Sequence, residues 1–242
     1  FLLAVAGFAA LALLALGGAP AQASDVAGDP ALRDVLAGFD RVQSTIRTLS
    51  AEFTETTENR LLKEPIRSKG RFFLTKPSSV LWEYTEPEAM RFSIVGDEYV
   101  GVFSQRKRAE RSDVHRWSER IFRIFGLGQT SGELGKFYSI RLADPGPGAP
   151  GTKLLLLEPK KRRVRKHIEI VRLWVSASTF LPAKIGLSGK GGYVKVIDLS
   201  DVKVNPDVAA SLYRIDIPPD FAVTNGTSGL ETVRPQGPSR PH

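Results

Sequence analysis

The side chains that could carry catalysis are sparse in this sequence and form no recognisable constellation. The three histidines, His115, His167 and His242, are far apart, and their spacing fits no metal site. Residues 186–189 read Gly-Leu-Ser-Gly and miss the Gly-x-Ser-x-Gly nucleophile elbow by their spacing. The glycine-rich stretch 189–192 matches no phosphate-binding loop and is better interpreted as a β-turn. We therefore expect no enzyme activity, no metal ion and no cofactor.

The strongest pattern is instead aromatic and aliphatic, and the chemistry it suits is the binding of apolar groups. Residues 69–87 read KGRFFLTKPSSVLWEYTEP. Two strand patterns, Gly70–Thr75 and Val80–Thr85, flank a Lys-Pro-Ser-Ser turn, because proline fixes its own φ and favours an extended residue before it. Side chains alternate across a strand, so Trp82 and Tyr84 share one face. That face needs a cover, and the pattern alone leaves open whether the cover is the protein's own core or a ligand.

The spacing of the other apolar residues predicts the elements that position this face. Asp29 followed by Pro30 is a helix start, and apolar residues then recur every three or four positions as far as Leu49. Short turns separate the strand patterns after that point, which favours one strongly curved antiparallel sheet, an incomplete β-barrel of a mostly β (α+β) class. We expect strands at Ser50–Thr57, Gly70–Thr75, Val80–Thr85, Met90–Val95, Glu98–Phe103, Phe137–Leu142, Thr152–Leu157, Ile168–Ser176, Leu181–Leu187, Tyr193–Ser200 and Leu212–Ile217.

The middle of the chain returns to helical spacing. The stretch His115–Phe125 gathers apolar side chains on one side, among them Trp117, Ile121 and Phe125, and ends at Gly126. With the N-terminal helix, this segment predicts a lid over the sheet. A second short helix is expected at Ser131–Lys136.

The two ends of the chain differ from the middle. Residues 1–16 are apolar and uncharged, and Ala21-Gln22-Ala23 is a small-x-small cleavage signature, so we expect a signal peptide over residues 1–23. A membrane anchor is the alternative for this apolar run. One β-rich domain is expected over residues 24–223, followed by a disordered Gly-, Ser- and Pro-rich tail over 224–242.

The net charge limits the classes of partner that we expect for this protein. The formal net charge is +8, and there is no cysteine. Nucleic acid is not expected as a partner of an exported protein, and anionic lipid headgroups are the more plausible acidic surface. The densest cluster is Lys160 to His167, which reads KKRRVRKH. It is either a transient contact for headgroups or an acidic partner, or a solvated hairpin loop.

Taken together, the Gly-apolar turn motif with Lys76-Pro77, the strand carrying Trp82, and the ending Leu199-x-x-Val202-x-x-Asn205 resemble one family. The chain is similar to the periplasmic lipoprotein carrier proteins, the LolA-like family, over most of residues 24–223. The resemblance implies a monomeric soluble carrier in the periplasm. Its partners would be lipoprotein acyl chains, an inner-membrane lipoprotein-release transporter and an outer-membrane lipoprotein receptor.

The resemblance also implies roles for individual residues. In this family an Arg at the position of Lys76 holds the covering helices shut, so Lys76 is the expected gate, although lysine offers a point charge instead of a planar fork. The expected acyl-binding residues are Phe72, Leu74, Val80, Trp82, Tyr84, Phe92, Ile94, Val171, Leu173, Ile197 and Leu199.

Two other functions remain open from the sequence. The first is an envelope sensor or regulator that binds lipid or peptide signals on the same half-barrel. The second is a carrier for another lipid, such as a glycolipid, because an apolar cavity distinguishes acyl cargoes poorly.

Overall fold

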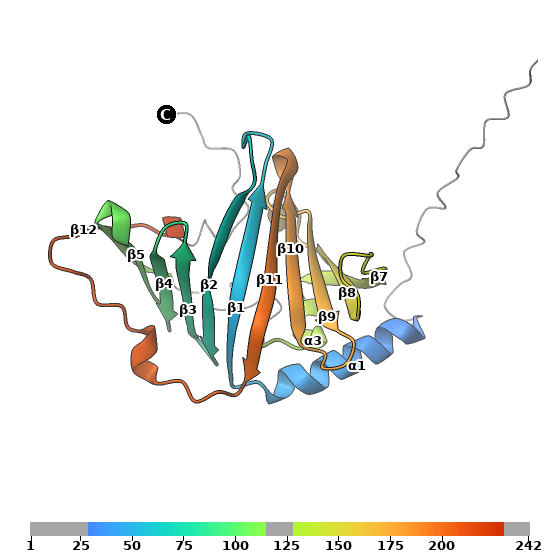
Figure 1. Ribbon diagram of the computed structural model, residues 1–242. Coiled ribbons are helices and arrows are strands. Elements are labelled where there is room, and N and C mark those ends of the chain that lie inside the picture. Colours follow the sequence, from blue (N-terminus) through green and yellow to red (C-terminus); the bar gives the residue numbers. More distant parts are fainter. Residues whose placement is uncertain (1–28, 115–127, 230–242) are drawn as a thin grey trace, which may run out of the picture.

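A single curved sheet dominates the computed structural model, which describes residues 29–114 and 128–229 (Figure 1). The sheet has twelve strands in the order β12-β6-β5-β4-β3-β2-β1-β11-β10-β9-β8-β7. All neighbouring strands run antiparallel except β12 and β6. The strands are β1 Thr48–Glu58, β2 Ile66–Thr75, β3 Ser79–Glu86, β4 Met90–Val95, β5 Glu98–Phe103, β6 Arg108–Asp113, β7 Tyr138–Ala143, β8 Thr152–Pro159, β9 Ile170–Ser176, β10 Pro182–Gly189, β11 Tyr193–Val204 and β12 Ala222–Thr224.

The helices in the described residues are few and short. They are α1 Pro30–Thr45, α3 Ser131–Gly135 and α4 Arg162–Arg165, with 3-10 turns at Ser104–Arg106, Lys190–Gly192 and Ala210–Tyr213. None of them is long and apolar enough to cross a bilayer. The predicted mostly β fold with an open curved sheet is therefore confirmed. The lid residues Trp117, Ile121 and Phe125 lie outside the described residues.

Helix α1 begins where its sequence predicts but ends at Thr45, four residues before the last apolar residue of the predicted helical stripe, because Ile46 is extended and β1 starts at Thr48. The Asp29 side chain accepts a hydrogen bond from the Ala31 amide at 2.9 Å, and Pro30 occupies the first turn. The face that carries Leu32, Val35 and Phe39 is buried against the sheet. In Figure 1, α1 crosses one end of the sheet, where β1 starts and β11 finishes. We call the sheet surface on which α1 packs the inner face.

The opposite, outer face is covered by the segment that follows β11. Tyr213 and Ile215 are buried there against Leu81, Val100 and Val102. We predicted a strand at Leu212–Ile217, and this prediction is wrong. Its alternating apolar residues lie across the sheet without pairing to a strand, and they open with a 3-10 turn at Ala210–Tyr213.

The disordered tail predicted over residues 224–242 is wrong for its first six residues, 224–229, which the structure describes as packed against the sheet. Strand β12, Ala222–Thr224, pairs in parallel with β6, and the Ser112 hydroxyl donates to the side chain of Asn225 at 2.6 Å. Gly229 then reaches the rings of Phe92 and Tyr99. Polar residues in this stretch have hydrogen-bond partners on β6, so residues 224–229 are held against the sheet despite their composition.

Candidate functional site

All eleven predicted acyl-binding residues lie on the inner face and belong to one apolar cluster with α1. The register explains their grouping, because Trp82 is the strand partner of Phe72 on one side and of Phe92 on the other. The ring centroids of Phe72 and Trp82 are 4.7 Å apart. All eleven are buried except Leu199, which is half-buried. The alternation of the sequence thus predicts which side chains share a face, whereas their role in binding is a separate question.

The inner face extends beyond those eleven residues. The same alternation continues into neighbouring strands and adds seven apolar side chains that the sequence reasoning did not single out. These are Phe53, Tyr99, Phe103, Leu155, Leu157, Ile185 and Leu187. The sequence could have indicated them, because apolar residues alternate with other residues in these strands too, although these strands contain no tryptophan. The result is one apolar surface that runs from β5 round to β8.

Lys76 links the β2–β3 turn to helix α1. Its Nζ donates a hydrogen bond to the Gln43 carbonyl oxygen at 3.2 Å, near the last turn of α1. Gly128 lies against the same lysine, since a Cβ at that position would be 2.9 Å from Lys76 Cε. Partial burial lowers the pKa of Lys76, and the nearby Glu133 opposes that shift. The lysine therefore holds α1 to the sheet, as a gate would require.

Gln43 is a site residue that the sequence reasoning missed. Its side chain is fully buried, and its Oε1 accepts a hydrogen bond from the Gly128 amide at 2.8 Å. Gln43 thus joins α1 to the point where the described chain resumes, while its own carbonyl accepts from Lys76. The signal in the sequence is a glutamine four residues after Phe39, which places it on the apolar side of the helix.

A charged pair is buried within the otherwise apolar inner face. Lys195 Nζ and Glu55 Oε1 are 2.7 Å apart, and their side chains are 1% and 6% exposed. The Tyr84 hydroxyl donates to the other oxygen of Glu55 at 3.0 Å. Burial lowers the pKa of Lys195, partly offset by Glu55, and burial beside Glu55 raises the pKa of Tyr84. The alternation in the sequence indicates that both residues share the inner face, because Glu55 follows Phe53 by two positions and Lys195 precedes Ile197 by two.

A second polar cluster lies at the β6 side of the inner face. Glu110 is 2% exposed, and it accepts hydrogen bonds from the hydroxyls of Tyr99 and Ser228. The Arg108 guanidinium donates to Ser228 at 2.9 Å and lies over the Phe103 ring. Burial beside Glu110 raises the pKa of Tyr99 above its ordinary range. These contacts fasten the end of the described chain to the inner face.

Two carboxylates of β3 form salt bridges at the surface. Glu83 pairs with Arg71 and Arg91, and Glu86 pairs with Lys69. Within residues 29–114 and 128–229, no group of three His, Asp or Glu side chains could hold a metal ion.

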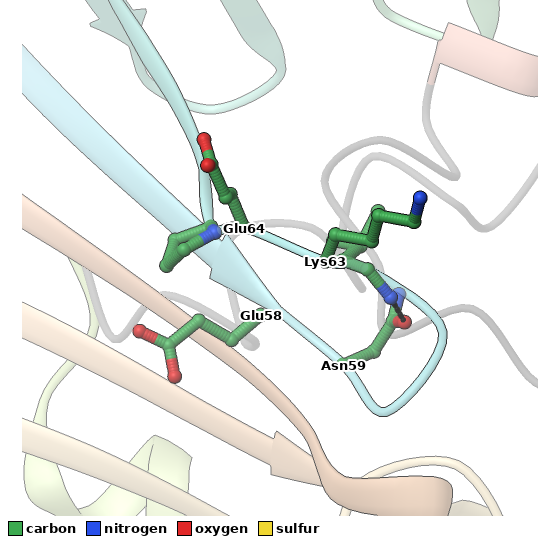
Figure 2. A pocket seen from close by; sticks show the side chains of 6 residues that line it. Glu58, Asn59, Lys63 and Glu64 are labelled. Carbon is green, nitrogen blue, oxygen red and sulfur yellow. Dashed lines mark hydrogen bonds between the residues drawn. The ribbon is translucent and has the colours of Figure 1, made fainter.

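The surface hollows lie away from the inner face. One lies under the tip of the β1–β2 hairpin, lined by residues that include Glu58, Asn59, Lys63 and Glu64, as Figure 2 shows. Another lies beside Asp97 and Asn225. Neither of these two hollows is lined by the aromatic residues of the sheet.

One solved structure shares this fold, and others resemble it more weakly. An uncharacterised conserved protein from Thermus thermophilus has a TM-score of 0.51 at 12% identity, with 81% of this chain and 99% of that chain covered. A LolA superfamily protein from Nitrosomonas europaea has a TM-score of 0.40 at 15% identity, covering 76% and 97%. The Mycobacterium tuberculosis lipoprotein LppX has a TM-score of 0.44 at 11% identity, covering 78% and 100%. The curated proteins contain no match.

A family match covers most of the fold. Residues 44–216 match the family described as outer membrane lipoprotein carrier protein LolA. The matched range runs from the end of α1 to the segment that crosses the outer face, and so includes β1 through β11. This chain therefore belongs to the LolA family of outer membrane lipoprotein carrier proteins.

Proposed function

We propose that this protein is a periplasmic carrier that shields lipoprotein acyl chains on its inner face and passes them from the inner to the outer membrane. The observation that supports the proposal is the continuous apolar face of the sheet, combined with membership of the LolA family. Each buried CH₂ group gains about 0.8 kcal/mol without demanding a fixed geometry, so such a surface suits flexible acyl chains. No covalent step is needed.

Transfer in this proposal depends on relative affinity alone. A release transporter of the inner membrane would load the carrier, and a receptor of the outer membrane would bind the same acyl chains more tightly. Because the inner face is buried, loading requires α1 or another cover to move aside. Trp117, Ile121 and Phe125 are proposed to belong to that cover, and the eleven sheet residues are proposed to contact the acyl chains.

Acyl binding is expected to fall at least tenfold when Leu199 is replaced by glutamate, because a carboxylate on the inner face must lose its hydration against an acyl chain. Leu199 is half-buried, so the variant is expected to fold. The measurement is native mass spectrometry of protein purified gently from the periplasm, followed by uptake of a diacylated peptide. Val196→Glu is the matched control, because Val196 is half-buried three positions earlier on the same strand and outside the inner-face cluster.

Unchanged uptake by Leu199→Glu would contradict acyl binding on this face. A wild-type protein that carries no lipid and takes up no acylated peptide would instead favour an envelope sensor, with the apolar face as ordinary core. Bound glycolipid in place of lipoprotein would keep the carrier class and change the cargo.

Lys76→Leu is expected to slow lipid release about fivefold, because the variant loses one hydrogen bond of about 1 kcal/mol that holds α1 over the empty face. Losing it stabilises the open, lipid-bound state relative to the closed one. The measurement is the half-time of transfer from loaded protein to acceptor vesicles. Lys76→Arg is the control, since arginine retains donors toward the Gln43 carbonyl and is expected to release lipid at least as fast as the wild type. Equal half-times for all three proteins would exclude Lys76 as the gate.

A further inference from the structure

Antiparallel pairing places three basic connections at one end of the sheet. The β1–β2 connection, the β10–β11 turn and the β8–β9 connection all leave the sheet at the end far from the start of β1. Figure 1 shows the β1–β2 hairpin and the β10–β11 turn side by side, extending beyond the other strands. We call residues 59–65, 160–169 and 190–192 together the basic end.

The basic end is continuous across the three connections. A Cβ at Gly192 would be 3.0 Å from Cγ of Arg60, so the hairpin rests on the neighbouring turn. The Glu169 amide donates to the Ser188 carbonyl oxygen at 2.8 Å, which joins the β8–β9 connection to the same turn. Charges from stretches far apart in sequence therefore lie on one surface.

This surface has a strong excess of positive charge. Its three segments contain nine Lys and Arg residues against two glutamates, and all nine cations are exposed. The strand connections at the other end, residues 76–78, 96–97, 144–151 and 177–181, contain one lysine and two aspartates. Arg162, Arg163 and Lys166 form no salt bridge with a carboxylate of the described residues. The net charge of the protein is thus concentrated at one end.

The same end also presents an apolar tip. Leu61 is 93% exposed between Arg60 and Lys63, and Ile66 is 47% exposed a few residues later. The tip is held in shape by Asn59, whose side-chain oxygen accepts hydrogen bonds from the Leu61 and Leu62 amides at 2.7 and 3.1 Å. A fixed turn therefore holds a leucine in water, where its exposure is unfavourable.

We propose that the basic end docks on an anionic lipid bilayer, with Leu61 inserted among the acyl chains and the surrounding Lys and Arg side chains at the headgroups. Apolar side chains at a tip ringed by cations match the layered chemistry of a bilayer surface, apolar below and anionic above. An acidic protein partner would satisfy the cations but would not explain the exposed leucine. This proposal does not depend on acyl binding at the inner face.

Vesicle flotation of the purified full chain tests the docking. Vesicles of phosphatidylcholine alone measure any binding by the apolar residues 1–16, and vesicles that also contain phosphatidylglycerol report the basic end. We expect binding to the acidic vesicles to exceed binding to the neutral ones and to weaken as salt is added. The variant R162E/R163E is expected to reduce binding to acidic vesicles at least tenfold, because it reverses two charges at the headgroups. The variant L61S is expected to reduce it about fivefold, because it removes the inserted apolar side chain.

Matched controls come from the other end of the sheet. Lys153→Glu changes an exposed lysine at the start of β8, and Val204→Ser changes a valine that is 37% exposed at the end of β11. Both are expected to bind acidic vesicles like the wild type. Equal binding by all four variants, or no preference of the wild type for acidic vesicles, would overturn the proposal and leave an acidic protein as the partner of these cations.

Discussion

Replacing Glu55 by leucine is expected to lower the free energy of unfolding by about 3–5 kcal/mol, because Lys195 would remain as an uncompensated charge in the core. Urea denaturation at neutral pH measures the loss. The deficit should shrink as the pH is raised. Burial lowers the folded-state pKa of Lys195 and Glu55 opposes that shift, so removing Glu55 lowers this pKa further. Between the pKa of Lys195 in the variant and that in the wild type, the unfolded variant binds more protons than the folded variant, so stability rises with pH in the variant alone.

The double variant separates a charge effect from a packing effect. Glu55→Leu with Lys195→Met removes both charges and is expected to recover all but about 1–3 kcal/mol, the cost of leaving the Tyr84 hydroxyl without its acceptor. A double variant as unstable as Glu55→Leu alone would mean that shape at this site matters more than charge. Recovery in the double variant would show that Glu55 and Lys195 stabilise the fold only together.

Gly70→Ala is expected to destabilise the protein by about 3 kcal/mol, because the new methyl group has no room. A Cβ at this position would lie 2.1 Å from the Glu83 carbonyl oxygen and 2.7 Å from the Phe53 ring. The register between β2 and β3 shifts between Lys69 and Gly70, so the backbones come unusually close at this bulge. Thermal unfolding monitored by tryptophan fluorescence gives the change.

Gly132→Ala is the matched control for Gly70→Ala. It lies within the short helix α3, and the nearest atom to a new Cβ is Thr130 Oγ1 at 4.0 Å. Alanine is the better helix former by about 0.5–1 kcal/mol, so this substitution is expected to raise stability slightly. A similar loss in both variants would show that the clash at Gly70 is relieved by movement of its neighbours.

Ten of the twelve strands of the described residues were predictable because local alternation fixes them, whereas β6 and β12 were not among the expected strands. Met90–Val95 and Glu98–Phe103 have the predicted bounds, and helix α1 has its predicted first residue. The assignment of side chains to the inner face followed from the same period of two. These features depend on each residue's immediate neighbours, which the sequence displays directly.

The features that escaped prediction depend on residues distant in sequence. Glu55 and Lys195 are separated by 140 positions, and each alone looks like an ordinary surface charge. The segment Leu212–Ile217 has a strand's alternation, yet Tyr213 and Ile215 pack on apolar side chains of the outer face of β3 and β5, whose two edges are already paired. In both cases the contact that decides the structure forms only after strands distant in sequence have paired.

The parallel strand β12 has a consequence for how copies of this protein meet. An open sheet, unlike a closed barrel, ends in strands whose amide and carbonyl groups could template a second chain. Ala222–Thr224 covers β6 for only three residues, and Gly226 and Ser228 then turn onto Ser112 and Glu110. On the β6 side the ladder thus ends in a strand of three residues, which offers a second molecule few amide and carbonyl groups with which to pair.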